Sequence, residues 1–314
     1  MIGLTEKRIT VTGGAGFLGT RVVEKLRGAG TKEVFVPRSR DCDLTDPAAV
    51  RRMYAEARPQ VVIHLAAAAG GIGANLANPG KFFYDNLMMG AQLMEEGRKA
   101  GLEKFVAVGT VSSYPKFAPV PFREEDLWNG YPDETTAPFG LAKKMLLVQA
   151  QAYRAQYGLN AICLLPVNLY GPGAPSDPAA AGVIPALVKR FSDAAAAGHK
   201  EVAVWGTGKA TREFLYVDDC AQAVCLAAAR YDKPEPVNVG SGFEISIKDL
   251  AKVIARLTGY TGRLAWDTSK PDGQPRRMTD TSRAADGFGF KAKTNFEEGL
   301  KKTIESYRGG RGQA

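Results

Sequence analysis

The sequence predicts an α/β fold, in which a doubly wound parallel sheet is followed by a smaller C-terminal α/β lobe. Apolar runs of strand length alternate with segments of helical periodicity through most of the chain, which is the pattern of parallel strands buried beneath helices. A glycine-rich turn joins the first apolar run to the first helical segment. The length of 314 residues suggests two domains.

The first unit consists of an apolar run at residues 8–11, a turn with the sequence TGGAGFLG and a helix. Gly13 allows a tight turn, Gly16 lets the backbone approach a pyrophosphate, and Gly19 lets the helix pack close to the strand. Phosphates are then expected at the helix N-terminus, against Phe17 and Leu18. We interpret this segment as a Rossmann dinucleotide site; a tight structural turn is the alternative.

The second strand, expected at residues 33–36, leads into a loop that contains Arg38 and Arg40. An acidic residue near this position binds the ribose 2′-hydroxyl of NAD, whereas arginines pair with the 2′-phosphate of NADP. The sequence therefore favours NADP, with NAD as the second choice. An exposed basic loop is the alternative interpretation of the two arginines. Asp43 and Leu44 follow and are expected to contact the adenine edge.

A continuous apolar run at residues 61–68, after a helix expected at 46–57, is typical of a buried parallel strand. The run ends in mostly small residues. Because small side chains at the end of a strand let a flat cofactor lie close, Leu65, Ala66 and Ala67 are candidate cofactor contacts.

A hydroxyl-rich loop with Thr110 and Ser112 follows the fourth strand, expected at residues 105–108. Ligands of open α/β sheets bind beyond the carboxyl ends of the strands, so this loop is expected in the site. An ordinary Ser/Thr turn is the alternative. In the preceding helix, expected at 82–100, Asn86 interrupts an apolar pattern, which predicts that its amide bonds backbone in the core.

The second half of the chain alternates helices and strands as well. Helices are expected at 142–157, 183–197, 217–229, 247–258 and 296–307, and strands at 160–165, 201–205 and 236–240. Asp218 and Asp219 are expected to cap the helix at 217–229. We predict that residues 1–167, with about 217–240, form the dinucleotide-binding domain. Residues 168–216 and 241–308 would form the substrate lobe, and 309–314 a disordered tail.

Composition excludes several classes of protein. The net charge of +8 is spread along the chain without a basic tract, so we expect no nucleic acid and favour a basic site for an anionic small molecule. No apolar run approaches the roughly 20 residues of a membrane helix, and the first residues lack the apolar segment of a secretory signal.

The four cysteines are scattered without a Cys-x-x-Cys pair, and the chain has two histidines. Scattered cysteines are typical of reduced thiols, which favours a cytoplasmic protein. So few histidines exclude a histidine-rich metal site, and no metal is expected.

Taken together, these motifs resemble the extended short-chain dehydrogenase/reductase family, in its branch that modifies nucleotide-linked sugars, over essentially the whole chain. Within this family the sequence is most similar to the GDP-L-fucose synthase subgroup. The resemblance is carried by the glycine turn, His64 to Ala67, Thr110 with Tyr114, Lys143, and segments at 70–75, 114–116, 166–172, 183–187, 205–208, 212–219 and 270–276.

The resemblance implies a catalytic tyrosine four residues before Lys143, whose hydroxyl exchanges a proton with the sugar C4 oxygen during hydride transfer. Lys143 would bind the nicotinamide ribose and lower the tyrosine pKa, and Thr110 would hold the same sugar oxygen. The tyrosine position, however, is Phe139, which keeps the ring and removes the acid. An engineered substitution, a natural loss of activity, and proton supply by Tyr114 or a water are the three explanations.

Two further departures concern epimerisation at C3 and C5, for which the subgroup uses a cysteine and a histidine. Ser112 and Gly182 occupy those positions, and neither is a useful base near neutral pH. The sequence therefore predicts an NADP(H)-dependent reductase at C4 of a nucleotide-linked 4-keto sugar. A nucleotide-sugar 4-epimerase is the alternative, and an inactive nucleotide-sugar-binding protein is the alternative from another class.

The resemblance also assigns a substrate side, with a GDP-linked sugar as first choice and a homodimer formed through helices 82–100 and 142–157. Arginines suit a diphosphate because they form paired charge-assisted bonds. The basic loop 270–277 is expected to close over the diphosphate. A core tryptophan, surface arginines and a solvated 270–277 loop are the structural alternatives. The substrate contacts implied are Asn168, Val183, Arg190, Trp205, Arg212 and Lys270, and the later cofactor contacts are Lys143, Pro166 and Asn168.

Overall fold

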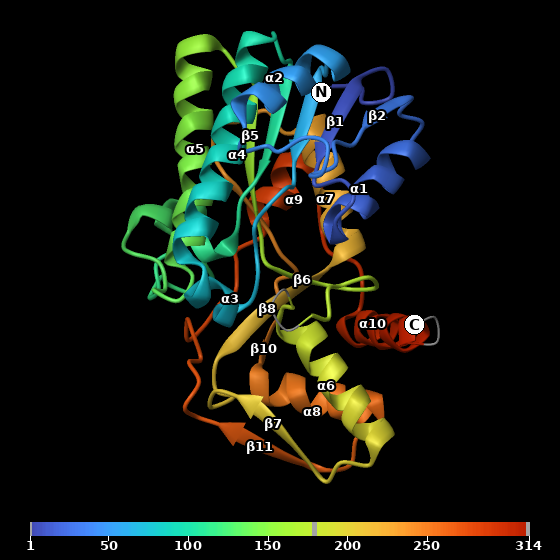
Figure 1. Cartoon of the computed structure of the whole chain (residues 1–314). Coiled ribbons are helices and arrows are strands. Elements are labelled where there is room, and N and C mark those ends of the chain that lie inside the picture. Colours follow the sequence, from blue (N-terminus) through green and yellow to red (C-terminus); the bar gives the residue numbers. More distant parts are fainter. Residues whose placement is uncertain (1, 178–180, 312–314) are drawn as a thin grey trace.

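The computed structural model describes residues 2–177 and 181–311, and its centre is a six-stranded sheet (Figure 1). Every neighbouring pair in this sheet is parallel. The strand order is β2-β1-β3-β4-β5-β9, so successive strands lie on opposite sides of β1. This confirms the predicted fold class. The strands are β1 (Arg8–Thr12), β2 (Glu33–Phe35), β3 (Val61–His64), β4 (Lys104–Val108), β5 (Ala161–Pro166) and β9 (Val237–Val239).

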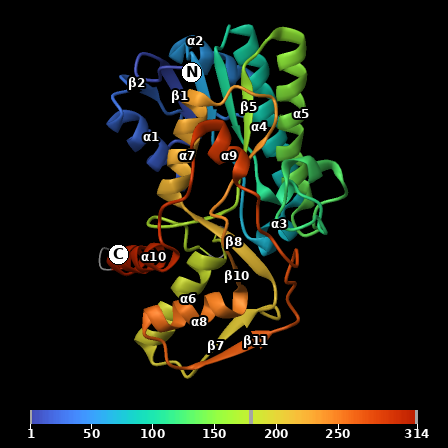
Figure 2. The same cartoon turned by 180° about the vertical axis from the view of Figure 1, so that it is seen from behind.

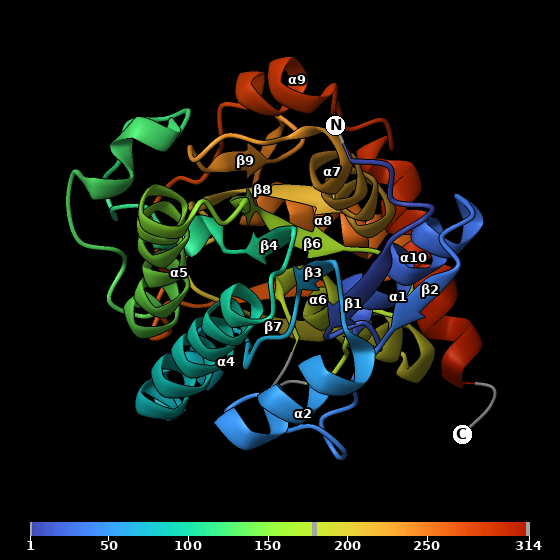
Figure 3. The same ribbon diagram turned by 90° about the horizontal axis from the view of Figure 1, so that it is seen from above.

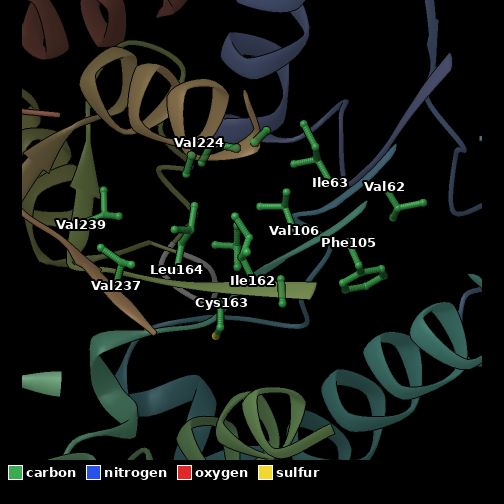
Figure 4. Packing of buried hydrophobic residues seen from close by; sticks show 14 of the residues in the cluster. Val62, Ile63, Phe105, Val106, Ile162, Cys163, Leu164, Val224, Val237 and Val239 are labelled. Carbon is green, nitrogen blue, oxygen red and sulfur yellow. The ribbon is translucent and has the colours of Figure 1, made fainter. Parts of the chain in front are cut away.

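Helices cover both faces of this sheet (Figure 3). One face carries α2 (Pro47–Ala57), α4 (Pro79–Lys99) and α5 (Ala137–Tyr157), and the other carries α1 (Phe17–Gly28), α7 (Val217–Arg230) and α9 (Ser282–Phe288). Neighbouring strand residues point to opposite faces, as Cys163 and Leu164 do in Figure 4. All residues of β3, β4 and β5 are buried, which explains why these strands are continuous apolar runs.

A second group of elements lies beyond the carboxyl ends of the strands (Figures 1 and 2). It has its own apolar cluster, which includes Ile184, Phe191, Leu250 and Ile254. The boundaries of the two domains remain a prediction. The elements are β6 (Asn168–Tyr170), β7 (Glu201–Trp205), β8 (Thr211–Tyr216), β10 (Glu244–Ser246), β11 (Arg263–Asp267), α6 (Val183–Ala197), α8 (Ile247–Thr258) and α10 (Phe296–Arg311).

Several predicted elements differ from those observed. The strand expected at 61–68 ends at His64, and a short helix α3 (Ile72–Ala77) follows. Helix α5 begins at Ala137 rather than at residue 142, because Pro138 lies in its first turn, where proline is tolerated. Asp218 and Asp219 lie inside the first turn of α7, whose N-cap residue is Tyr216, so the predicted aspartate cap is wrong.

The predicted tail is partly wrong as well, since α10 continues through residues 309–311. Residues 312–314 lie outside the described part of the chain. The prediction for Asn86 is confirmed: its Nδ2 donates to the carbonyl oxygens of Ala68 (2.8 Å) and Phe82 (2.6 Å). Among the described residues, no helix combines the length and hydrophobicity of a membrane span.

Candidate functional site

The glycine turn joins β1 to α1 at the point where the strand order reverses. Gly13 has a φ of +71°, and a Cβ built on it would lie 2.7 Å from the Ala66 backbone nitrogen. A Cβ on Gly19 would overlap the Gly13 carbonyl oxygen. Gly16 is the N-cap residue of α1, and no side chain caps the helix. Uncapped N–H groups at a helix start are suited to an anion.

The loop between β2 and α2 carries the two predicted 2′-phosphate ligands. Arg40 is exposed and forms a 3.2 Å ion pair with Asp41. The Asp43 carboxylate accepts hydrogen bonds of 2.8 Å from the Thr45 backbone and hydroxyl, which lower the pKa of this carboxyl. Leu44 lies in the apolar core, so only part of it is available to an adenine edge.

The turn after β4 packs directly against the start of α5. Ser113 Oγ donates to the Gly140 carbonyl oxygen (2.8 Å), and a Cβ on Gly140 would overlap the carbonyl oxygen of Ser112. Thr110 Oγ1 accepts a 3.1 Å hydrogen bond from the Ser112 backbone. The structure therefore brings Thr110 and Ser112 close to the first turn of α5, which contains Phe139.

Phe139 and Lys143 lie four residues apart on α5 and so share one face of the helix. Lys143 is buried, and its Nζ donates to the Ala66 carbonyl oxygen at 3.2 Å, in the segment that follows β3. Burial lowers the pKa of Lys143 to about 8. Lys143, the glycine turn and the end of β3 are therefore adjacent.

Tyr114 lies away from this group. Its ring is fully buried and stacks on Phe122, and its hydroxyl donates to Asn238 Oδ1 at 2.8 Å. Burial, followed by the nearby Glu124 carboxylate, raises the pKa of Tyr114 far above its ordinary value. Tyr114 is therefore excluded as the proton source that would replace a tyrosine at position 139.

The predicted substrate residues lie on several elements of the second group. Asn168 Nδ2 donates to the Glu213 carbonyl oxygen (3.3 Å), and Pro166, at the end of β5, pairs with β9. Val183 is the first residue of α6, preceded by Gly182 as N-cap. Arg190 donates to the Ala203 carbonyl oxygen at 2.6 Å, so its guanidinium is held against β7.

Trp205, at the end of β7, is half exposed, which excludes the alternative of a core tryptophan. Lys270 Nζ lies 5.4 Å from the centre of its ring. A Cβ on Gly73 of α3 would lie 3.8 Å from the same ring. Arg212, in contrast, is a buried residue of β8. An exposed aromatic face beside a lysine is suited to stacking on a planar group.

Residues 268–281, which we call the strap, connect β11 to α9. Gln274, Arg277 and Thr279 of the strap are buried, so the interpretation of 270–277 as a solvated loop is wrong for Gln274 and Arg277. Gln274 Nε2 donates to the Pro115 carbonyl oxygen (2.9 Å), which fixes the strap against the turn after β4. Arg277 belongs to the loop expected at the diphosphate but was not singled out as a site residue, because the surrounding prolines, glycine and charges indicate a surface loop.

The model of the NAD dependent epimerase/dehydratase family matches residues 9–240. The chain belongs to this family. Members of the family are nucleotide-sugar oxidoreductases and epimerases of the short-chain dehydrogenase/reductase type, and the glycine turn and Lys143 lie within the matched region. A GDP-L-fucose synthase from Sinorhizobium fredii is 38% identical over 304 residues, which are 97% of this chain and 96% of that protein.

Two solved structures of this family type resemble the chain over nearly its whole length. A GDP-6-OMe-4-keto-L-xylo-heptose reductase from C. jejuni is 29% identical with a TM-score of 0.91, covering 98% of this chain and 99% of its own. A GDP-mannoheptose C4 reductase from Campylobacter jejuni with NADP bound is 30% identical with a TM-score of 0.86, covering 98% and 100%.

Proposed function

We propose that this protein is an NADP(H)-dependent reductase that acts at C4 of a GDP-linked 4-keto sugar, without epimerisation at C3 or C5. The observation that carries the proposal is that Lys143 bonds the Ala66 carbonyl beside Gly13, while the turn from Thr110 to Ser113 packs on Gly140, next to Phe139 on the same helix. The similar proteins described above support the GDP-sugar and the C4 position, since two of them are C4 or 4-keto reductases by name.

The residues present fit NADP. The uncapped start of α1 and the Cβ-free surface at Gly13 would hold the pyrophosphate. Arg38 and Arg40 would pair with the 2′-phosphate, and Lys143 would bind the nicotinamide ribose. When bound, the reduced cofactor supplies a hydride to the sugar carbon.

The remaining residues position the sugar. Thr110 would donate its hydroxyl to the C4 oxygen, and Arg212 with Arg190 would bind the diphosphate. Trp205 and Lys270 would pack against the nucleoside. Ser112 and Gly182 offer no base for proton abstraction at C3 or C5, which supports a reductase without epimerisation.

We further propose a cytoplasmic homodimer. All four cysteines are free thiols, which suits a reducing compartment. Helices α4 and α5 carry the exposed apolar side chains of Tyr84, Val148 and Tyr157, and such a surface is suited to a second copy.

A second candidate function is an inactive nucleotide-sugar-binding protein, because Phe139 removes the expected proton donor. Replacing Phe139 with tyrosine separates the two candidates. If the chain is a reductase with a lost acid, F139Y is expected to increase NADPH consumption with a GDP-linked 4-keto sugar by about 10²- to 10⁴-fold, the usual contribution of general acid catalysis. An F139Y protein that binds the sugar nucleotide but never consumes NADPH would favour the binding protein.

The absence of epimerisation is tested in deuterated water. NMR of the product is expected to show no deuterium at C3 or C5, because proton exchange there requires a base. Deuterium at either carbon would show that Ser112 or another group acts as that base, and the reductase assignment would have to include epimerisation.

A further inference from the structure

Two buried arginines of the candidate site are held by hydrogen bonds to neutral oxygens. Arg212 and Arg277 are 8% and 7% exposed. Within residues 2–177 and 181–311, neither guanidinium forms an ion pair. Arg212 donates to the carbonyl oxygens of Thr211 (2.7 Å) and Asp272 (2.8 Å), and Arg277 to the side-chain oxygens of Gln274 (3.1 Å) and Ser112 (3.5 Å). Buried charges are normally paired, so this arrangement is suited to binding a negatively charged group.

The two arginines reach different parts of the site. Arg212 is tied to β8 and to Asp272, at the start of the strap. Arg277 extends from the far end of the strap to Ser112, in the turn that begins at Thr110 and packs on the first turn of α5. Of the two, Arg277 is therefore the one that reaches the residues proposed to surround the reacting carbon.

The charge of Arg277 is poorly compensated by its surroundings. Burial lowers its pKa to about 9, repulsion from Arg212 contributes in the same direction, and Asp133 opposes the shift. Asp133 is itself occupied, because its carboxylate accepts a hydrogen bond from the Thr135 backbone (3.1 Å) and lies 3.7 Å from Lys116 Nζ. Arg277 still carries its charge near neutral pH, and an oxygen with partial negative charge would be attracted to it.

Because position 139 is a phenylalanine, another residue has to donate hydrogen bonds to the sugar oxygen. A phenylalanine ring cannot donate a hydrogen bond to a sugar oxygen, and Tyr114 is held in the core by Asn238. A guanidinium beside Ser112 is a fixed donor that can stabilise negative charge on an oxygen as the charge develops.

We propose that Arg277 binds the sugar of the GDP-linked substrate, donating its guanidinium N–H groups to the oxygen on the carbon that is reduced, while Arg212 binds the diphosphate. The inference rests on the proposed function and names a residue for its sugar end. Hydride from the reduced cofactor would turn the carbonyl into an alkoxide, and a water would then protonate that oxygen. Arg277 remains protonated throughout and transfers no proton; its role is to hold the oxygen and to stabilise its negative charge until the water protonates it.

The test compares three variants of the whole protein. R277Q removes the charge, R277K keeps a cation without the planar fork, and R276Q is the matched control, because Arg276 is an exposed neighbour that pairs with Glu244. For each variant, calorimetry gives the affinity for GDP and for the GDP-linked sugar, and rapid mixing gives the rate of NADPH oxidation at saturating sugar.

R277Q is expected to bind GDP within about 2-fold of wild type and the GDP-sugar at least about 10-fold more weakly, since roughly 1.4 kcal/mol of sugar binding corresponds to a factor of ten. The oxidation rate should fall by about 10²- to 10³-fold, the usual effect of removing one donor to a developing oxyanion. R277K should recover part of both losses, and R276Q should match wild type.

Other outcomes overturn the inference. Equal losses of affinity for GDP and GDP-sugar would place Arg277 at the diphosphate. If R277Q binds and reduces the sugar like wild type, Arg277 has no role, although the proposed function stands. If wild type and F139Y neither bind nor reduce any GDP-linked 4-keto sugar, the proposed function and this inference both fail. If R277Q does not fold, R277K decides, since a purely structural cation would leave GDP-sugar affinity unchanged in R277K.

Discussion

Lys143 is a buried cation whose nearest described partner is a carbonyl oxygen rather than a carboxylate. Its Nζ lies 3.2 Å from the Ala66 oxygen, and burial lowers its pKa from the ordinary 10.5 to about 8. Holding a charge in this environment costs folding free energy. Lys143 therefore destabilises the fold, and we expect that its role is in binding rather than in folding.

Replacing Lys143 with methionine is expected to stabilise the protein at neutral pH. The lowered pKa of Lys143 corresponds to a free energy of unfolding on the order of 3 kcal/mol higher in K143M than in wild type. Because the folded-state pKa is the lower one, the unfolded wild-type chain binds more protons between about pH 8 and 10.5. The stability of wild type relative to K143M should therefore rise across that window, and the advantage of the variant should shrink.

Urea unfolding at several pH values measures this difference, and taking the difference cancels other groups that titrate in the same range. Lys32 is exposed, and K32M is a control expected to change the free energy of unfolding by less than about 0.5 kcal/mol. A constant difference between wild type and K143M from pH 7 to 10.5 would show that the charge of Lys143 costs the fold nothing.

At the residue scale, sequence patterns could predict which side chains share a helix face, but not which charged side chains are buried. The four-residue spacing of Phe139 and Lys143 predicts one helix face, and the structure has both on α5. Arg277 could not be found in this way, since its burial depends on Gln274 bonding the Pro115 carbonyl, a contact between positions 159 residues apart. Nothing in the local sequence distinguishes Arg277 from its exposed neighbour Arg276.

At the element scale, helix α1 depends on two glycines that face each other across the turn. A Cβ on Gly19 would overlap the Gly13 carbonyl oxygen, whereas a Cβ on Gly28, the last residue of α1, would meet nothing within 4 Å. The pair offers a matched comparison on one helix. It separates the cost of overlap from the ordinary effect of exchanging glycine for alanine.

G19A is expected to reduce the free energy of unfolding by about 1–3 kcal/mol, the usual cost of overpacking, and to weaken NADP binding because α1 must move away from the turn. G28A should be neutral or stabilising by up to about 1 kcal/mol. Urea unfolding and NADP titration measure both effects. A G19A protein as stable as G28A, with unchanged NADP affinity, would contradict the close packing described here.

The exact limits of some elements could be predicted from the sequence. Other elements were missed because charged residues interrupt their apolar patterns. Helices α6 and α8 and strand β7 have the predicted limits, because periodicity and flanking glycines define them. Strand β8 was missed because Arg212 and Glu213 interrupt its apolar pattern, yet both are buried. A buried charge that is satisfied by distant segments has the same local appearance as a surface charge.

At the scale of the whole molecule, Glu213 joins the three-stranded sheet β10-β8-β6, the segment after β9 of the six-stranded sheet, and the strap. Its Oε1 accepts hydrogen bonds from the backbones of Ser241 (2.6 Å) and Gly242 (2.7 Å), just after β9, and its Oε2 accepts from the backbone and hydroxyl of Thr279. Burial raises the pKa of Glu213, which these hydrogen bonds oppose. One carboxylate therefore holds β8, the end of β9 and the strap together.

E213A is expected to reduce the free energy of unfolding by roughly 3–5 kcal/mol, because it leaves several buried donors without an acceptor. The control is E201A, which removes an exposed ion pair with Arg263 and should cost less than about 1 kcal/mol. Urea unfolding compares the two. Equal small losses would mean that water replaces the carboxylate and that the link is weaker than its geometry indicates.

In the proposed homodimer, helices α4 and α5 would form the interface. Helices α4 and α5 lie side by side on one face of the sheet (Figures 1 and 2), and Val148 of α5 is 43% exposed. In a dimer formed through these helices, an aspartate at this position would place an unpaired charge in an apolar interface, which costs about 3 kcal/mol or more. V148D should therefore weaken association by at least about 100-fold.

Light scattering over a concentration series measures the mass of each species. Wild type is expected at twice the chain mass of 33.6 kDa, and V148D at the chain mass. Phe243 is an apolar side chain of similar exposure next to β10, away from α4 and α5, so F243D should remain dimeric and controls for the added charge. A monomeric wild type would refute the dimer. A dimeric V148D would show that the interface lies on another surface. Loss of the dimer in F243D alone would identify the face beside β10 as that surface.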